Sequence, residues 1–278
     1  MADQHESAGS RVISGLDSLG LRAVNMLAHI GALYFLLVEA SGWVLKRVTS
    51  RNVRLGRVAV VAQIVRVGVA SIFIVSLVSG SIGFILGMQM APPLDKLGQV
   101  NLVPNIVAVA VLRELGALIA AIVLVGFAGA SIAAEIGTMV VGEEVEALEA
   151  HALNPVRFLV VPRVIATVIS MTCLAVLSNI MAIVSAALMS KTVLGISWVT
   201  YYNNTLAQVG PRDFTTGLVK AAVFGMLIGL IACGNGLRVT GGAAGVGKAT
   251  TSTVVESVVA VIFADLMFTV VFYALGLV

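Results

Sequence analysis

The sequence is poor in charged residues. Asp, Glu, Lys and Arg make up 11% of its 278 residues, whereas apolar residues make up 59%. A soluble domain has about 25% charged and about 45–50% apolar residues. The mean hydropathy of +1.06 points the same way. This composition argues against a soluble fold, a disordered chain and a nucleic-acid-binding protein, and it indicates an integral membrane protein.

Residues that bind metals or form disulfides are also scarce. The two cysteines, Cys173 and Cys233, lie in apolar runs, which is not the pattern of a disulfide framework or a zinc site. The three histidines, His5, His29 and His151, are far apart in the sequence. The positions of these residues give neither the spacing of metal ligands nor a nucleophile–base pair. We therefore expect neither a metal site nor catalytic residues.

Long uncharged runs recur along the chain. A hydrocarbon core about 30 Å thick needs roughly 20 apolar residues in a helix, and a helix satisfies its own backbone hydrogen bonds in lipid. The runs do not alternate as the strands of a membrane barrel would. We therefore predict an all-α integral membrane protein with five transmembrane helices, over about residues 67–91, 103–134, 158–190, 214–237 and 254–278.

The first 50 residues form a separate N-terminal segment in this prediction, and residues 51–278 form the membrane domain. The apolar stretch 23–38 has only 16 residues and is flanked by charges. That length suits a helix lying at the membrane interface better than a span. A sixth transmembrane helix stays open as the alternative.

Lys and Arg are unevenly distributed between the loops. With a cytoplasmic N-terminus, the inner segments 1–66, 135–163 and 238–256 hold twelve basic residues, and the outer segments hold three. This asymmetry follows the positive-inside rule. We therefore expect the N-terminus in the cytoplasm and, after five spans, the C-terminus outside.

Acidic residues cluster once, between the second and third predicted spans. The cluster is Glu135, Glu143, Glu144, Glu146 and Glu149. Residues 142–150 are predicted to form a short helix with Glu143, Glu146 and Ala147 on one face, because residues three and four apart are neighbours on a helix. Two interpretations stay open, a solvated acidic loop and a docking helix for a cytoplasmic partner with a basic groove.

Four charged residues interrupt the apolar runs, Arg113, Glu114, Lys220 and Asp265. A charge inside a membrane is costly and normally faces a partner or a polar cavity. Adjacent residues on a helix point about 100° apart, so Arg113 and Glu114 cannot neutralise each other face to face. Either these are structural ion pairs between helices, or Arg113, Glu114 and Lys220 line a polar pocket for a substrate headgroup. We assign Asp265 to helix packing.

A glycine-rich stretch late in the chain, G-A-A-G-V-G-K-A over residues 242–249, nearly matches a phosphate-binding loop. It fails at Ala249, which has no hydroxyl to hold Mg²⁺, and it follows an apolar helix instead of a strand. We expect its glycines to form a tight turn between the fourth and fifth spans.

Several stretches carry motifs in a fixed order. They are L-R-E-L-G-A-L at 112–118, A-A-E-I-G-T-M at 133–139, E-E-V-E-A-L at 143–148, N-P-V-R-F-L-V-V-P-R at 154–163, Asp213-Phe, G-L-V-K at 217–220 and G-G-A-A-G-V-G-K-A-T-T at 241–251. Over about residues 50–278 the chain resembles the MlaE/YrbE family, the permease subunits of ABC lipid transporters that work with MCE-domain proteins. It departs from the family at Phe127, where an arginine is usual.

The resemblance implies a homodimer of permeases with an MlaE-type fold in the bacterial inner membrane. Two cytoplasmic ATPase subunits would hold ATP and Mg²⁺, and this chain would hold no cofactor. An MCE-domain substrate-binding protein would sit on the outer side, and the family's assemblies also allow a small STAS-like accessory subunit. In that family such transporters serve outer-membrane lipid asymmetry.

The resemblance also implies roles for residues. The Arg-Glu pair of the family's second helix and the Lys of its fourth lie near the lipid cavity, which corresponds to Arg113, Glu114 and Lys220. The ATPase would dock on a coupling helix. The motif that supports this helix would include Glu135, Arg157 and Arg163. The coupling-helix residues are Glu143, Glu144, Glu146, Ala147 and Leu148.

We therefore hypothesise that the chain provides the membrane path for a phospholipid and performs no covalent chemistry. The main alternative is an ion-coupled secondary transporter that uses Glu114, Lys220 and Asp265 as a proton relay. A weaker alternative is a membrane scaffold that transports nothing.

Overall fold

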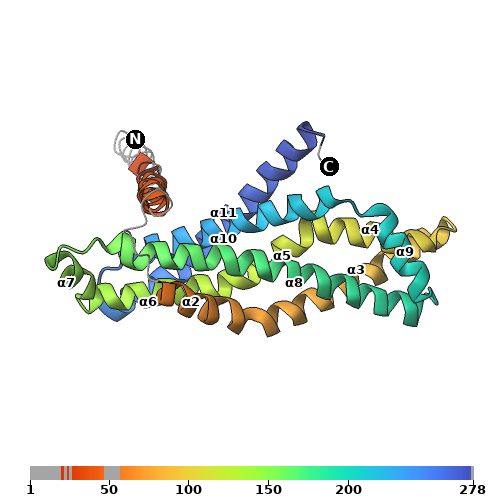
Figure 1. Cartoon of the computed structure of the whole chain (residues 1–278), viewed down its shortest axis with the longest axis horizontal. Coiled ribbons are helices and arrows are strands. Elements are labelled where there is room, and N and C mark those ends of the chain that lie inside the picture. The colour runs from red at the N-terminus through yellow and green to blue at the C-terminus, as the bar shows by residue number, and fades with distance from the viewer. Residues whose placement is uncertain (1–19, 22–23, 25–26, 47–56, 277–278) are drawn as a thin grey trace, which may run out of the picture.

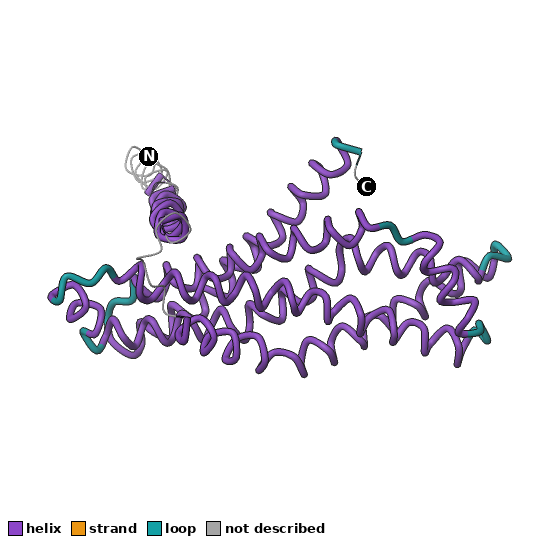
Figure 2. The backbone as a smooth tube through the Cα atoms, viewed as in Figure 1, coloured by secondary structure: helices purple, strands orange, loops and turns teal. Residues whose placement is uncertain are grey.

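The computed structural model describes residues 20–21, 24, 27–46 and 57–276. Within these ranges the chain forms helices and no strands. Figure 2 shows that the loops gather at the two ends of the bundle and at the C-terminal end of the last helix. The prediction of an all-α fold is confirmed.

Five long helices make up the bundle (Figure 1). The first comprises α2 (Arg57–Gln63), η1 (Ile64–Gly68), η2 (Val69–Ser71) and α3 (Ile72–Lys96). The second comprises η3 (Val100–Leu102), α4 (Val103–Ala110), η4 (Val111–Leu115), α5 (Gly116–Leu124), η5 (Val125–Gly129) and α6 (Ala130–Val141). The third comprises η6 (Val156–Val160) and α8 (Val161–Val193), the fourth is α10 (Pro211–Leu237), and the fifth is α11 (Gly242–Ala274).

These helices are each long and apolar enough to cross a membrane. The first four predicted spans lie inside the corresponding helices, which extend beyond them at one or both ends. The fifth predicted span, 254–278, reaches past the end of α11 at Ala274. The span limits within the membrane stay predictions.

Two short helices lie at opposite ends of the bundle (Figure 1). One is α7 (Glu144–Ala150), which joins the second long helix to the third, and the other is α9 (Trp198–Gln208), which precedes α10. The backbone N–H of Thr200 donates to Ser197 Oγ at 3.1 Å. This N-cap satisfies one of the free donors at the start of α9.

Small residues allow the central helix α8 to pack closely against α3 and α10. A Cβ added at Gly83 of α3 would lie 2.1 Å from the carbonyl oxygen of Ala182. A Cβ at Gly225 of α10 would lie 2.8 Å from the carbonyl oxygen of Thr167. Helices in a membrane associate through such close approach because lipid gives them no hydrophobic drive toward each other.

The helix Leu27–Lys46 runs across the bundle, whereas α3, α8 and α10 run along it and the C-terminal part of α11 leaves it obliquely (Figure 1). It packs through Ala40, which is 5% exposed, and through Leu33, which lies over Gly234 of α10. By length and composition it too is able to span a membrane. Its direction favours the predicted interfacial helix, which stays a prediction. Most of the remaining residues of the segment 1–50 lie outside the described part of the chain.

The predicted tight turn over residues 242–247 is wrong. The helix α11 begins at Gly242, so Gly245 and Gly247 lie within its first two turns. The turn itself is made by Gly241 and Gly242, whose φ angles of 84° and 69° favour glycine. A Cβ at Gly245 would lie 1.9 Å from the carbonyl oxygen of Thr240, so this glycine lets the helix start close against the turn.

Candidate functional site

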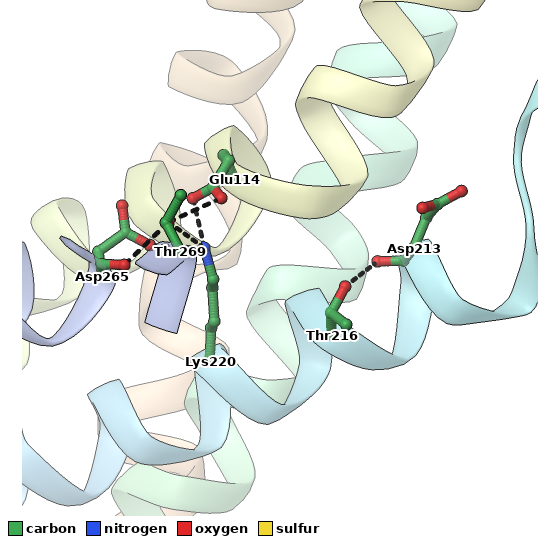
Figure 3. Close-up of polar contacts among 6 residues, drawn as sticks. All are labelled: Glu114, Asp213, Thr216, Lys220, Asp265 and Thr269. Atoms are coloured by element: carbon green, nitrogen blue, oxygen red, sulfur yellow. Dashed lines mark hydrogen bonds and ion pairs between the residues drawn. The ribbon is translucent and has the colours of Figure 1, made fainter. Parts of the chain in front are cut away.

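A buried lysine joins three of the long helices at the centre of a polar network (Figure 3). The side chain of Lys220, on α10, is 1% exposed. Its Nζ donates to Glu114 Oε2 on η4, to Asp265 Oδ1 on α11 at 3.0 Å, and to Thr269 Oγ1 on α11 at 3.1 Å. Thr269 Oγ1 lies 3.0 Å from Glu114 Oε1, which closes the network.

The network accounts for every donor of the lysine. An ammonium group has three N–H donors and no acceptor, and Lys220 meets three acceptors. A charge buried without such partners would be strongly disfavoured. Because the partners come from η4 and α11, the charge of Lys220 links the fourth long helix to the second and the fifth.

Arg113 belongs to a second, separate ion pair. Its Nε lies 2.6 Å from Asp213 Oδ1 at the start of α10. Asp213 Oδ2 also accepts from the backbone N–H of Gly210 at 2.8 Å, so this carboxylate caps α10 as well as pairing with Arg113. Asp213 and Lys220 are seven residues apart on α10, which is about 10 Å along the helix. Arg113 and Glu114 therefore face two different partners.

The local backbone explains this separation. Arg113 and Glu114 lie in η4, a π-helical segment of five residues inside the long second helix. Such segments are rare, and they occur frequently at functional sites. The helix α10 approaches η4 closely because Gly217 has no side chain: a Cβ there would lie 2.2 Å from the carbonyl oxygen of Leu112. Any larger residue at 217 would push α10, and with it Lys220, away from Glu114.

An apolar groove of about 450 Å³ lies along α4. Asn105, Val109 and Arg113 follow each other at intervals of four residues, so they share one face of the helix. The groove itself does not include Arg113, Glu114 or Lys220, and their common pocket stays a prediction. The groove is lined by Leu102, Asn105, Ile106, Val109, Ala110 and Gln208.

The acidic segment forms a helix that starts slightly later than expected. Glu143 has a left-handed backbone with φ 59° and stands before α7, so it does not share the helical face of Glu146 and Ala147. The carboxylates of Glu144 and Glu146 lie in the first turn, where the helix dipole favours negative charge. None of the residues of α7 is buried. A surface helix with an acidic start thus protrudes from one end of the bundle (Figure 1).

Comparison with known proteins identifies the family to which this architecture belongs. The family model described as Permease MlaE matches residues 60–271, which include the ion pairs, the groove and α7. The chain belongs to the MlaE permease family. It is therefore a multi-pass membrane protein of the ABC transporter permease class.

The relatives of this MlaE permease agree with that assignment. A probable ABC transporter permease protein of Rickettsia prowazekii is 35% identical over 214 residues, which is 77% of this chain and 83% of the relative. A probable ABC transporter permease protein of Synechocystis is 32% identical over 212 residues, 76% of this chain and 81% of the relative. The chloroplastic protein TRIGALACTOSYLDIACYLGLYCEROL 1 of Arabidopsis thaliana is 34% identical over 211 residues, 76% of this chain and 60% of that protein.

The supporting motif of this MlaE permease is divided in the structure. Glu135 pairs with Arg163 at 2.9 Å and with Arg66 at 2.8 Å, which joins α6, α8 and η1 at the end that carries α7. Arg157 stands apart, with its guanidinium carbon 5.3 Å from the ring centre of Trp43. Phe127, where the family has arginine, is 44% exposed.

Sequence reasoning missed several partners in this MlaE permease. The assignment of Asp265 to helix packing agrees with the structure, but its partner, Lys220 on α10, was not predicted. Asp213 was recognised only as part of a motif, and nothing in the pattern singled out Arg66 or Thr269. The signal for Asp265 was its isolation in an apolar run. The described residues hold no group of three or more His, Cys, Asp or Glu side chains placed to hold a metal ion.

Proposed function

We propose that this permease provides the membrane path for a phospholipid, and that ATP hydrolysis on separate ATPase subunits drives the movement. The proposal includes a second copy of the chain, an MCE-domain protein on the outer side, and a cytoplasmic N-terminus in the bacterial inner membrane. The observation that carries it is the buried network of Glu114, Lys220 and Asp265, which joins three membrane helices. Charges buried in membrane helices are costly, and they commonly mark a path for substrate or ions.

The lipid headgroup would meet Arg113. The side chain of Arg113 is 28% exposed, so a phosphate can reach the guanidinium, which binds phosphate with two parallel hydrogen bonds. The acyl chains would lie along the apolar groove on α4, whose volume of about 450 Å³ is in the range of ligand sites. When phosphate displaces Asp213 from Arg113, α10 loses one of its two ionic ties to the second long helix.

Motion would pass to this site along one continuous helix. The long second helix carries Glu114 in η4 and ends at Val141, directly before α7. Glu114 and Val141 are 27 positions apart, which is about 40 Å along a helix. Glu135 ties the same helix to η1 and α8, so a push on α7 moves these elements together. Closure of the ATPase subunits against α7 would therefore change the spacing of the helices around Lys220.

The class of substrate is supported by one relative. The Arabidopsis protein is named after trigalactosyldiacylglycerol, a glycerolipid. A glycerolipid has a polar head and two acyl chains, and these are the two parts for which Arg113 and the groove provide partners. We assign the phospholipid because Arg113 favours an anionic headgroup.

Affinity purification from native membranes in mild detergent, followed by mass spectrometry of proteins and lipids, tests this proposal. We expect an ATPase subunit, an MCE-domain protein and phospholipid to co-purify with the permease. A lone oligomer without these partners would contradict it. A second contradiction would be transport by the permease alone in ATP-free vesicles with a pH gradient, because that result identifies an ion-coupled transporter.

A further inference from the structure

A second apolar cavity lies outside the groove on α4. A cavity of about 340 Å³ separates the helix Leu27–Lys46 from α8 and α10. Its lining is apolar except for Ser41, and its volume is within the range of about 300–1,000 Å³ that ligand sites have. Leu45 at its edge is 70% exposed, so the cavity opens to the surface of the bundle. The lining includes Leu37, Ser41, Leu45, Val161, Ile169 and Met226.

Two polar contacts fix the helix Leu27–Lys46 to the rest of the bundle. The helix Leu27–Lys46 is fixed near its start by His29, whose Nε2 lies 3.0 Å from Glu256 on α11. Farther along, Asn154 Nδ2 donates to Glu39 Oε1 at 2.8 Å. One face of this helix, turned toward the bundle, carries residues at intervals of four, namely Leu37, Ser41 and Leu45. The helix is therefore fixed to the bundle by these two contacts, and the cavity lies beside this face.

Two cations and a tryptophan lie beside residues that line the cavity, although none of the three lines it directly. Lys46 follows the lining residue Leu45, and Arg157 lies one turn before the lining residue Val161, on the same face of its helix. Lys46 Nζ is 4.9 Å and the Arg157 guanidinium carbon 5.3 Å from the ring centre of Trp43. Within the described residues, neither cation forms an ion pair with a carboxylate, and the carboxylate of Glu39 is occupied by Asn154.

We propose that this cavity binds one acyl chain of an anionic phospholipid, with its phosphate between Lys46 and Arg157. The lining extends over nine residues of α8, from Val161 to Ile169, and the rise between these two is about 12 Å. That is most of the ~15 Å thickness of one leaflet's hydrocarbon. Basic pockets between membrane helices bind anionic headgroups, and tryptophan favours the interface. The site does not depend on the transport path at Arg113.

Fluorescence of Trp43 tests the proposal directly. The chain has two tryptophans, so the variant Trp198→Phe leaves Trp43 as the only one. The full-length protein is placed in phosphatidylcholine vesicles that contain brominated phosphatidylglycerol or, at equal mole fraction, brominated phosphatidylcholine. We expect the anionic lipid to be preferred at Trp43 by at least about fivefold, since each basic side chain near a membrane surface contributes roughly that factor.

Matched variants distinguish the site from general surface charge. In Lys46→Gln with Arg157→Gln, the preference should fall to about one. In Lys191→Gln it should persist, because Lys191 lies 5.2 Å from the ring of Trp198 at the far end of α8. Ser41→Leu fills the cavity and should reduce quenching by both lipids.

Three results would overturn the proposal. The first is equal quenching by the two lipids, which is also the result expected if a helix of a second copy fills the cavity. The second is a preference that survives the double substitution at Lys46 and Arg157. The third is undiminished quenching in Ser41→Leu, which would place the lipid on the surface only.

Discussion

At the scale of single residues, the charge of Lys220 is the most demanding feature of this permease. Its ammonium is almost fully buried and satisfies all three donors on Glu114, Asp265 and Thr269. A buried ion pair adds little stability compared with apolar packing, but removing one partner leaves an uncompensated charge. The network therefore makes the second, fourth and fifth long helices dependent on one another.

Removal of the cation alone should destabilise the protein. In Lys220→Met the two carboxylates face each other without a counter-ion, and we expect a loss of about 3–5 kcal/mol, seen as a lower unfolding temperature in detergent. Adding Glu114→Gln and Asp265→Asn should restore most of the stability, because no charge then remains unpaired, but it should not restore transport. An unfolding temperature of Lys220→Met equal to that of the wild type would contradict this interpretation of the network.

Sequence alone located these charges but not their pairing. The isolation of Arg113, Glu114, Lys220 and Asp265 in apolar runs was visible because charges are rare there. Their partners depend on how helices far apart in the chain are rotated, and the π-helical η4 shifts that rotation locally. For this reason Arg113 was grouped with Glu114, whereas the structure pairs it with Asp213.

At the scale of helices, close contact between α10 and η4 positions the network. Gly217→Ala should cost about 1–3 kcal/mol as an overpacking substitution, because its Cβ would meet the backbone of Leu112. Gly247→Ala is the matched control: no atom lies within 4 Å of its Cβ, and alanine in a helix is favoured by roughly 0.5–1 kcal/mol. Thermal unfolding of the two variants should shift in opposite directions, and equal shifts would contradict the packing account.

The acidic helix α7 allows a second comparison on one element. Glu146 and Glu149 are both exposed, and Glu146 lies in the first turn. If the first turn docks on the ATPase, Glu146→Lys should weaken co-purification of that subunit roughly tenfold or more, as expected when a charge pair in an interface is lost. Glu149→Lys should have a smaller effect. Equal losses in both variants would indicate general charge attraction and no defined docking face.

The helices themselves could largely be predicted because long apolar runs have few structural alternatives in a membrane. The ends of the helices could not be predicted. Hydropathy does not report where a helix continues into the aqueous phase, so α3 and α8 extend beyond the predicted spans 67–91 and 158–190. The glycines at 245 and 247 predicted a turn, because glycine is common in turns. The structure instead places both in α11, where Gly245 allows the helix to approach Thr240 closely.

At the scale of the whole molecule, one continuous helix connects the two regions to which we propose functions. The second long helix runs from the groove on α4, through Arg113 and Glu114, to α7 at the opposite end (Figure 1). The large apolar faces of α3 and α11 remain exposed, as expected of surfaces that meet lipid or another copy of the chain. The proposed lipid path lies between the groove and the ion pairs.

The most direct test is ATP-driven transfer of labelled phospholipid by the purified complex in vesicles, with Arg113→Gln compared with Arg212→Gln. The control removes a neighbouring charge that is exposed and stands next to Asp213. We expect a loss of transfer of at least about tenfold in Arg113→Gln, as expected when a charged hydrogen-bonding partner of the headgroup is removed. Assembly should be unchanged, and the control should show full transfer. Full transfer by the Arg113→Gln complex would contradict the proposed path.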